Sequence, residues 1–333
     1  MGHAIAQTRN GDYMTAWQGD TPWHGLGTSV SGLMTAEEAL SKAHLDWNVI
    51  KKPLSYENNG LHEVIPNTFG AFREDGDNLI PLTRGKALGK VWKPLQNIEA
   101  FSFLDDLMQN QEAKIEVCGA LGNGERVWAL AKMPNSVMLK DTDKIDQYVL
   151  ISNTHDGSGA VRFLHTPIRV VCANTLTWAL QQGRGQGYNI RHTGKMGDRV
   201  DDAREAMGFI NEDFLQWGEM ASDLLTVEMD NDDRDEYFVK AFGLSYNDEG
   251  DLTTRSENIL DKARTVLTRP TNQLNDMGNT AWGAYNAVTE TIDHEFTKLR
   301  NGEKSLKRME STLFGPFAKK KQGAWKLAYQ LTQ

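Results

Sequence analysis

The most regular pattern of hydrophobic and polar positions lies between residues 147 and 183. Residues 148–151 form an apolar run, Asp156-Gly157-Ser158-Gly159 has the composition of a tight turn, and residues 160–165 are typical of a returning strand. The pattern predicts a β-hairpin at this point of the chain.

From Thr166 the period changes. Hydrophobic residues recur every three or four positions as far as Gly183, and Pro167 suits the first turn of a helix. We therefore expect the hairpin to continue directly into an amphipathic helix. The β-branched pair Val170-Val171 favours a strand instead, so the start of this helix is defined only to within a few residues.

The residues before this stretch alternate mainly with period two. A second hairpin is predicted over residues 115–134, with Gly122-Asn123-Gly124 as its turn. Short strands are expected between residues 47 and 96, including one that carries Lys90 and Trp92 on a common face. Thr35 and Asn97 are expected to cap two helices, at 36–45 and 98–110.

After Gly183 the period becomes mostly helical. Helices are expected over residues 198–225, 237–242, 257–269 and 280–299, and the acidic run 228–236 is interpreted as solvated surface. The prediction is therefore an α+β protein. Residues 1–190 form a core of mostly antiparallel sheet with packed helices, and residues 191–333 form a mainly helical C-terminal region.

Composition limits the class of protein without deciding its partners. The 333 residues are 39% hydrophobic and 24% charged, as in ordinary globular chains, and carry no signal-peptide pattern and no apolar run of 18 residues. We expect a cytoplasmic protein that makes no membrane contact. The net charge of −9 leaves room for a local basic groove. The two cysteines, Cys118 and Cys172, are expected to be free and buried.

Motifs for nucleotide hydrolysis, dinucleotide redox chemistry and zinc binding are absent from the sequence. One candidate for catalysis is a group of His155, Asp156 and His165 near Cys172. His155 lies beside a turn glycine and is explained as a polar turn residue. Cys172 lies on the apolar side of the predicted helix and is explained as a core residue. We therefore expect no cofactor and no metal, and the sequence argues against an enzyme.

Two predicted strands carry a tryptophan beside basic residues. Arg126, Trp128 and Lys132 point to one side of the 126–133 strand, as Lys90 and Trp92 do on the earlier one. One interpretation is that the tryptophans are core residues, with basic side chains packed along them. The other is an exposed platform on which the bases of single-stranded nucleic acid stack.

Arg162 and Arg169 are further candidates for nucleic-acid binding. Arg169 would lie in the first turn of the predicted helix, where a cation is unfavourable unless an anion meets it. A phosphate backbone would serve, with Asn174 as a neutral donor nearby. A structural salt bridge is the alternative explanation.

Three segments carry a resemblance to a known family: TPWHGLG (21–27), HTPIRVVCANTL (165–176) and NTAWGAYNAVTETIDH (279–294). They resemble the signature blocks of a phage/plasmid-like family of unknown function, the domain of unknown function 932. The resemblance implies a protein encoded by a phage or plasmid, hence one of the host cell cytoplasm. It implies no reaction. A weaker similarity, of hairpins followed by a helix, is to the core of phage single-strand annealing proteins.

Three hypotheses follow. The first is a non-enzymatic phage DNA-metabolism protein that binds single-stranded DNA, forms homo-oligomeric rings or filaments and promotes annealing or recombination. The second is a module that binds a host or phage protein through its acidic helical surface. The third is a metal-dependent hydrolase or nuclease. For the first, the proposed binding residues are Lys90, Trp92, Arg126, Trp128, Lys132, Arg162, Arg169 and Asn174.

Overall fold

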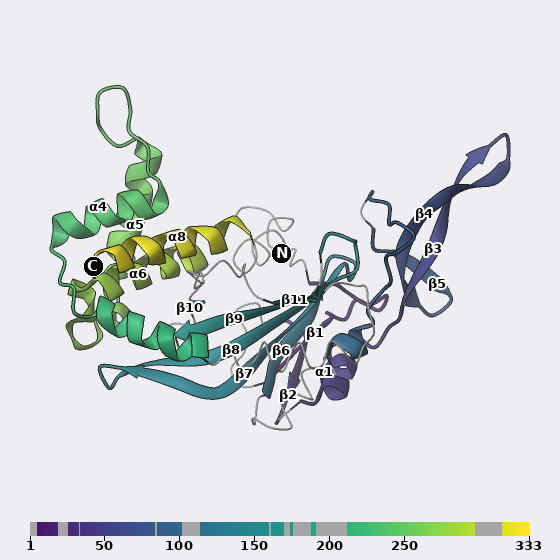
Figure 1. The fold of residues 1–333 in the computed structure, drawn as a ribbon, viewed down its shortest axis with the longest axis horizontal. Helices are drawn as coiled ribbons and strands as arrows, with labels where there is room; N and C mark the ends of the chain where they lie inside the picture. Colours follow the sequence, from purple (N-terminus) through teal and green to yellow (C-terminus); the bar gives the residue numbers. More distant parts are fainter. Residues whose placement is uncertain are drawn as a thin grey trace.

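Strands occupy the first part of the chain and most helices the last part, as Figure 1 shows. The computed structural model describes residues 5–18, 26–32, 34–83, 85–101, 114–159, 161–169, 174–175, 188–190, 212–296 and 315–333. The strands are β1 (Thr15–Gln18), β2 (Thr28–Val30), β3 (Val49–Asn58), β4 (Leu61–Asp75), β5 (Asn78–Pro81), β6 (Lys114–Leu121), β7 (Arg126–Leu139), β8 (Asp143–Thr154), β9 (Val161–Arg169), β10 (Asn174–Thr175) and β11 (Tyr188–Ile190). The helices are α1 (Ala36–Lys42), α4 (Asn231–Phe242), α5 (Thr254–Leu267), α6 (Ala281–Glu290) and α8 (Pro316–Gln330), with short turns η1 (Pro270–Asn272), η2 (Leu274–Asn279) and η3 (Thr291–Glu295). Residues 97–101 and 212–224 are also helical.

The central sheet has the order β10-β9-β8-β7-β6-β1-β2, and β11 also pairs with β9. Its described pairs are antiparallel except β1–β2, which is parallel. The alternation predicted for β7 is confirmed, because Val127, Ala129, Ala131 and Met133 all face one core. Helix α1 supplies Ala36, Ala39 and Leu40 to the same cluster.

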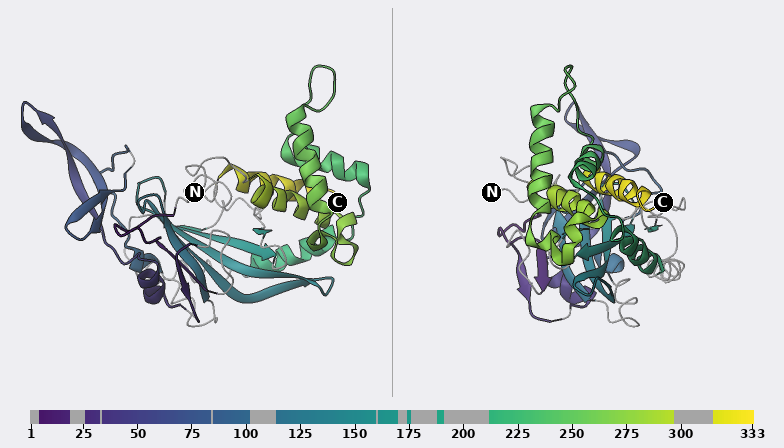
Figure 2. Two further views of the ribbon diagram at one scale, coloured as in Figure 1. Left: turned by 180° about the vertical axis from the view of Figure 1, so that it is seen from behind. Right: turned by 90° about the vertical axis from the view of Figure 1, so that its left-hand side faces the viewer.

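A small sheet, in the order β3-β4-β5, lies at one end of the molecule. Its β3–β4 hairpin projects away from the other elements (Figures 1 and 2). The pairing of β3 with β4 is interrupted between Pro53 and Ser55, so the distal hairpin 55–64 lies beyond an irregularity in the ladder. The side chains of this distal hairpin are all exposed.

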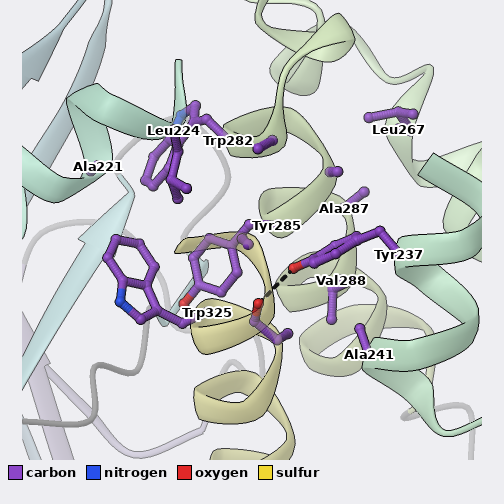
Figure 3. Packing of buried hydrophobic residues seen from close by; sticks show 14 of the residues in the cluster. Ala221, Leu224, Tyr237, Ala241, Leu267, Trp282, Tyr285, Ala287, Val288 and Trp325 are labelled. Carbon is purple, nitrogen blue, oxygen red and sulfur yellow. Dashed lines mark hydrogen bonds between the residues drawn. The ribbon is translucent and has the colours of Figure 1, made fainter. Parts of the chain in front are cut away.

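The helical region is built around α6, every residue of which is buried. Its core is aromatic: the Trp325 ring stacks on Trp217 at 5.4 Å between centroids and meets the edge of Tyr285 at 5.1 Å. Tyr237 of α4 donates a hydrogen bond to the Ala324 carbonyl of α8 at 2.9 Å (Figure 3). No helix in the described ranges is both long and apolar enough to cross a membrane.

The helical core continues into the central sheet. Leu139 and Ile145, at the β7–β8 turn, belong to the same hydrophobic cluster as α4, α5, α6 and α8. Trp282 donates its indole N–H to the buried Asp143 carboxylate at 3.0 Å. The division of the chain near residue 190 stays a prediction, and the residues that flank the β7–β8 turn, Leu139 and Ile145, pack in the core of the helical part.

Several predicted elements are confirmed. The fold is α+β, with both hairpins present and with helices in the C-terminal region. Thr35 caps α1 through a reciprocal capping box with Glu38. The predicted stripe Phe214, Trp217, Ala221 and Leu224 is buried along the 212–224 helix.

The helix predicted to begin at Thr166 is wrong at its start. Strand β9 continues to Arg169, with Thr166 opposite Tyr148 and Pro167 opposite Gln147 of β8. Pro167 is tolerated because β11 pairs only with residues 161–163 and β10 only with 168–169, which leaves an edge between them in the described structure. The argument from a helix dipole at Arg169 fails with this helix, and residues 170–173 and 176–187 lie outside the described ranges.

Two further expectations are corrected. Residues 86–96 do not form a strand, since only Leu88 bridges to Phe69, and the Lys51 ammonium holds the loop by donating to the carbonyls of Gly89, Lys90 and Trp92. Asn97 is not an N-cap. It is the first helical residue and is buried. Its side-chain N–H donates to the Leu45 carbonyl, and its side-chain oxygen lies 2.9 Å from His155 Nε2. The preceding residue, Gln96, donates its backbone N–H to the Glu99 carboxylate.

The acidic run begins a helix earlier than expected. Asp230 caps α4 through a capping box with Asp233, and the following acids favour the N-terminal end of the helix dipole. Helix α4 therefore starts at Asn231 and not near Tyr237.

Candidate nucleic-acid interface

Four of the predicted residues share one face of the central sheet. The register places Trp128 opposite Ser152, and Ser152 opposite Arg162. Arg126 lies two positions before Trp128 on β7, and Lys132 lies four positions after it. Side chains that are directly paired, or separated by an even number along a strand, point to the same face. The structure therefore brings together Arg126, Trp128, Lys132 and Arg162.

Trp128 does not form a stacking platform in this structure. Its side chain is 3% exposed and packs in a small cluster with Leu121, at 4%, and Leu150, at 1%. An indole this deeply buried has no open face for a base. The interpretation of Trp128 as a core residue is the one that the geometry supports.

Lys132 is committed to acidic neighbours. Its ammonium lies 2.6 Å from the buried Asp146 carboxylate and 4.0 Å from Glu116. Tyr148 lies below it, with the ring centroid 5.9 Å from Nζ, and donates its hydroxyl to Glu116 at 2.8 Å. Burial is the first cause that raises the Tyr148 pKa, and the Glu116 carboxylate adds to it. Much of the positive charge of Lys132 is therefore neutralised within the sheet.

Arg162 differs from Lys132 in this respect. Its side chain is partly exposed, and it forms no ion pair with any residue that the structure describes. Arg126, also partly exposed, lies opposite Thr154, which is diagonal to Arg162 on the strand between them. Strands β7 and β9 are about 10 Å apart, so the two guanidinium groups can reach toward the same region.

The two ends of the sheet differ in charge, although Glu125 and Asp156 lie in the turns at the arginine end. Arg126 and Arg162 lie at the end formed by the β6–β7 and β8–β9 turns, whereas the acid-rich helices join the opposite end, at the β7–β8 turn. Exposed acids on and beside α4 include Asp230, Asp232, Asp233, Glu236, Asp248 and Glu249. The net charge of −9 therefore does not describe the arginine end of the sheet.

Lys90 and Trp92 lie on the loop that packs against the small sheet. Lys90 is exposed, and Trp92 is half-buried against the cluster of Val49, Leu82 and Leu88. Leu88 contacts Gly157 in the β8–β9 turn, because a Cβ built on Gly157 would lie 2.3 Å from Leu88 Cδ2. The loop thus meets the arginine end of the sheet, although not as a strand.

Arg169 and Asn174 are paired with each other through the β9–β10 register. Arg169 is also opposite Ile145 of β8. Their side chains lie outside what the structure describes, as do Cys172 and most of the 21–27 segment.

The candidate catalytic group has structural roles where it can be seen. His155 is fully buried, its Nε2 is 2.9 Å from Asn97 Oδ1, and its ring meets Trp47 edge-on. Asp156 accepts the N–H and the hydroxyl of Ser158 in the turn. Cys118 is free and buried, as expected, and burial raises the pKa of its thiol to about 12. The side chain of His165 is not among the described ones.

Sequence reasoning missed Thr154, which lies between the two arginines. Its side chain is buried, and its hydroxyl has no hydrogen-bond partner among the described residues. Pairing the second strand of the first predicted hairpin with the first strand of the second one would have placed Thr154 beside Arg126.

Sequence reasoning also missed the ion pairs that hold the 279–294 block, of which, among the described residues, only Lys321–Asp293 is buried on both sides. Lys321 of α8 is 0% exposed and lies 3.0 Å from Asp293, while Arg269 bonds Glu290 at 2.6 Å and Glu295 at 2.5 Å. These contacts surround η3, a π-helical turn. The residues of this segment therefore have structural roles, in core packing and in ion pairs.

Comparison with known proteins gave one match. A search of curated proteins and a search of solved structures both found nothing similar. The family model described as "Domain of unknown function (DUF932)" matches residues 86–313, which include the arginine end of the sheet and the α6 block but not residues 21–27. Because this match spans more than half of the sequence, the chain belongs to the DUF932 family.

Proposed function

We propose that this protein binds single-stranded DNA without catalysing a reaction, through phosphate contacts from Arg126 and Arg162. The observation that supports the proposal is their placement on one sheet face, at the end away from the acidic helices. Partly exposed guanidinium groups are well suited to phosphate oxygens, which accept charge-assisted hydrogen bonds from them.

The face of an antiparallel sheet suits a single strand better than a duplex. Sheet faces bind single strands in several nucleic-acid-binding folds, where cations follow the backbone. In this proposal Trp128 is a buried packing residue on the same face, and affinity comes mainly from phosphate contacts. Binding would then depend little on base sequence and strongly on salt. The biological setting we propose is the DNA metabolism of a phage or plasmid, in the cytoplasm of its host, with annealing as the activity to assay.

The test is fluorescence anisotropy of a labelled single-stranded oligonucleotide, with duplex DNA of the same sequence as the comparison. We expect tighter binding of the single strand. Arg162→Ala should weaken it about tenfold or more, the effect of losing a charged hydrogen bond of about 1.5–3 kcal/mol. Arg255→Ala, at an exposed position of α5, is the matched control and should bind like the wild type. Absence of binding at low salt would overturn the proposal.

The second candidate function is binding of another protein, and the projecting β3–β4 hairpin favours it. Tyr56, Leu61 and Val64 are 49%, 69% and 59% exposed on the distal hairpin. A two-stranded hairpin is marginally stable alone. The register places Tyr56 and Leu61 on one of its faces and Val64 on the other, so both faces present an apolar side chain to a partner. The acidic helices are a weaker choice, since Asp235 and Asp261 pair with Arg264, and Glu236 pairs with Lys240.

This candidate is tested by a pull-down from host lysate together with size-exclusion chromatography of the purified protein. The double variant Leu61→Thr/Val64→Thr keeps strand-forming residues and should lose any partner that the hairpin holds. Leu331→Ser serves as the control. It replaces another exposed leucine, at 47% exposure, that lies outside the hairpin. Equal retention of a partner by both variants would remove the hairpin from consideration.

A further inference from the structure

The turn end of the β8–β9 hairpin brings a buried hydroxyl group close to an arginine side chain. Thr154 is 5% exposed, and its hydroxyl has no hydrogen-bond partner in the described structure. A Cβ built on Gly159 would lie 3.1 Å from Thr154 Oγ1 and 4.0 Å from Arg162 Nη2. The hydroxyl, the guanidinium and the bare backbone of Gly159 therefore border one point.

A buried hydroxyl without a partner is costly, by about 1–3 kcal/mol, so such groups usually have a ligand or water. Here the neighbouring group is a cation that forms no ion pair with any described residue. An oxygen atom that reached both groups would accept hydrogen bonds from Thr154 and Arg162. The charge of Arg162 selects an anion over a neutral acceptor.

Gly159 carries no side chain, and Arg162 beside it is partly exposed. No side chain at position 159 separates the hydroxyl from the guanidinium. Asp156, the nearby turn carboxylate, is turned to the N–H and hydroxyl of Ser158, at 2.9 and 2.5 Å. Its charge is thus partly satisfied within the turn.

We propose that Thr154, Gly159 and Arg162 form a phosphate subsite that binds one phosphodiester oxygen of the DNA backbone. The inference rests on the proposed function for the identity of the ligand. The subsite defines where on the sheet the DNA strand is held. Arg126 lies beside the subsite, opposite Thr154.

Two variants test the subsite with little risk to the fold. Thr154→Val keeps the shape of the side chain and removes the hydroxyl. Gly159→Ala adds a methyl group 3.1 Å from the Thr154 hydroxyl oxygen and 4.0 Å from Arg162 Nη2, at a residue whose φ is not in the left-handed region. Gly323→Ala is the matched control, because a Cβ there meets nothing within 4 Å.

The first measurement is independent of DNA. The side-chain N–H signal of Arg162 is assigned in an NMR spectrum by its loss in Arg162→Lys, and inorganic phosphate is titrated in. We expect the signal to shift in the wild type and in Gly323→Ala, and to stay in place in Gly159→Ala. If the Arg162 signal of the wild type does not shift when phosphate is added, the subsite is overturned.

The second measurement is oligonucleotide affinity. Thr154→Val and Gly159→Ala should each weaken single-strand binding, Gly159→Ala by about tenfold, which corresponds to about 1.4 kcal/mol. If the wild type binds DNA and both variants bind equally well, the subsite is wrong and the proposed function stands. If Arg162 responds to phosphate but the wild type does not bind DNA, the proposed function is wrong and the anion site stands.

Discussion

Replacement of Trp128 distinguishes a core residue from a stacking platform. In the structure its side chain is buried with Leu121 and Leu150, so Trp128→Ala would leave a large cavity between strands β6, β7 and β8. Truncation of a buried tryptophan costs about 3–5 kcal/mol. Folded proteins are stable by only about 5–15 kcal/mol, so much of the stability of the sheet would be lost.

The assay is urea unfolding followed by circular dichroism, with DNA affinity measured on the same samples. Trp128→Phe keeps an aromatic ring in the cluster and should lose far less stability than Trp128→Ala. We expect Trp128→Phe to bind DNA like the wild type, because the indole does not touch a base. If Trp128→Ala unfolds like the wild type but loses DNA affinity, the burial argument is refuted and a stacking role follows.

Two other predictions concern buried groups. Lys321 is fully buried against Asp293, so Lys321→Met should cost about 3–5 kcal/mol because it removes the cation beside a buried carboxylate. Lys321→Met/Asp293→Asn should recover most of this loss in urea unfolding. No recovery in the double variant would mean that the pair is not the source of the loss. For Cys118, burial raises the thiol pKa from 9.0 to about 12, so its contribution to stability is complete below pH 9 and is lost as the pH rises toward 12. In a Cys172→Ala background, a thiol reagent near neutral pH should label Cys118 only as fast as the chain unfolds. Labelling at the rate of a free thiol would contradict its burial.

The local elements that could be predicted from the sequence are those set by nearby residues. Turn glycines and alternating apolar positions define both hairpins, and Thr35 with Glu38 defines the start of α1. The buried stripe on the 212–224 helix follows from spacing alone. In each case the information lies within a few residues of the element itself.

The wrong predictions concern segments whose structure depends on distant partners. The 166–169 segment is compatible with helix and strand, and pairing with β8 decides for the strand. The 86–96 loop is fixed by Lys51, which is far away in the sequence. The burial of Trp128 likewise depends on Leu121 and Leu150, which only the assembled sheet brings to it.

The candidate site could be predicted in part for the same reason. Alternation along β7 placed Arg126, Trp128 and Lys132 on one side, but it gave no information on their neighbours across the sheet. The ion pair of Lys132 with Asp146 and the position of Thr154 beside Arg126 require the register. Charge and aromatic content therefore indicated one face of β7 as a candidate, whereas the neighbours of these residues on that face emerged only from the pairing.

The most direct test of the account is the salt dependence of single-strand binding by the wild type, Arg162→Ala and Arg255→Ala. Each phosphate neutralised on a single strand contributes about −0.7 to the slope of log K against log salt. We predict that Arg162→Ala weakens binding and makes the slope shallower by about 0.7, while Arg255→Ala changes neither. An unchanged affinity and slope for Arg162→Ala, in a wild type that binds DNA, would contradict the claim that this face of the sheet binds the DNA backbone.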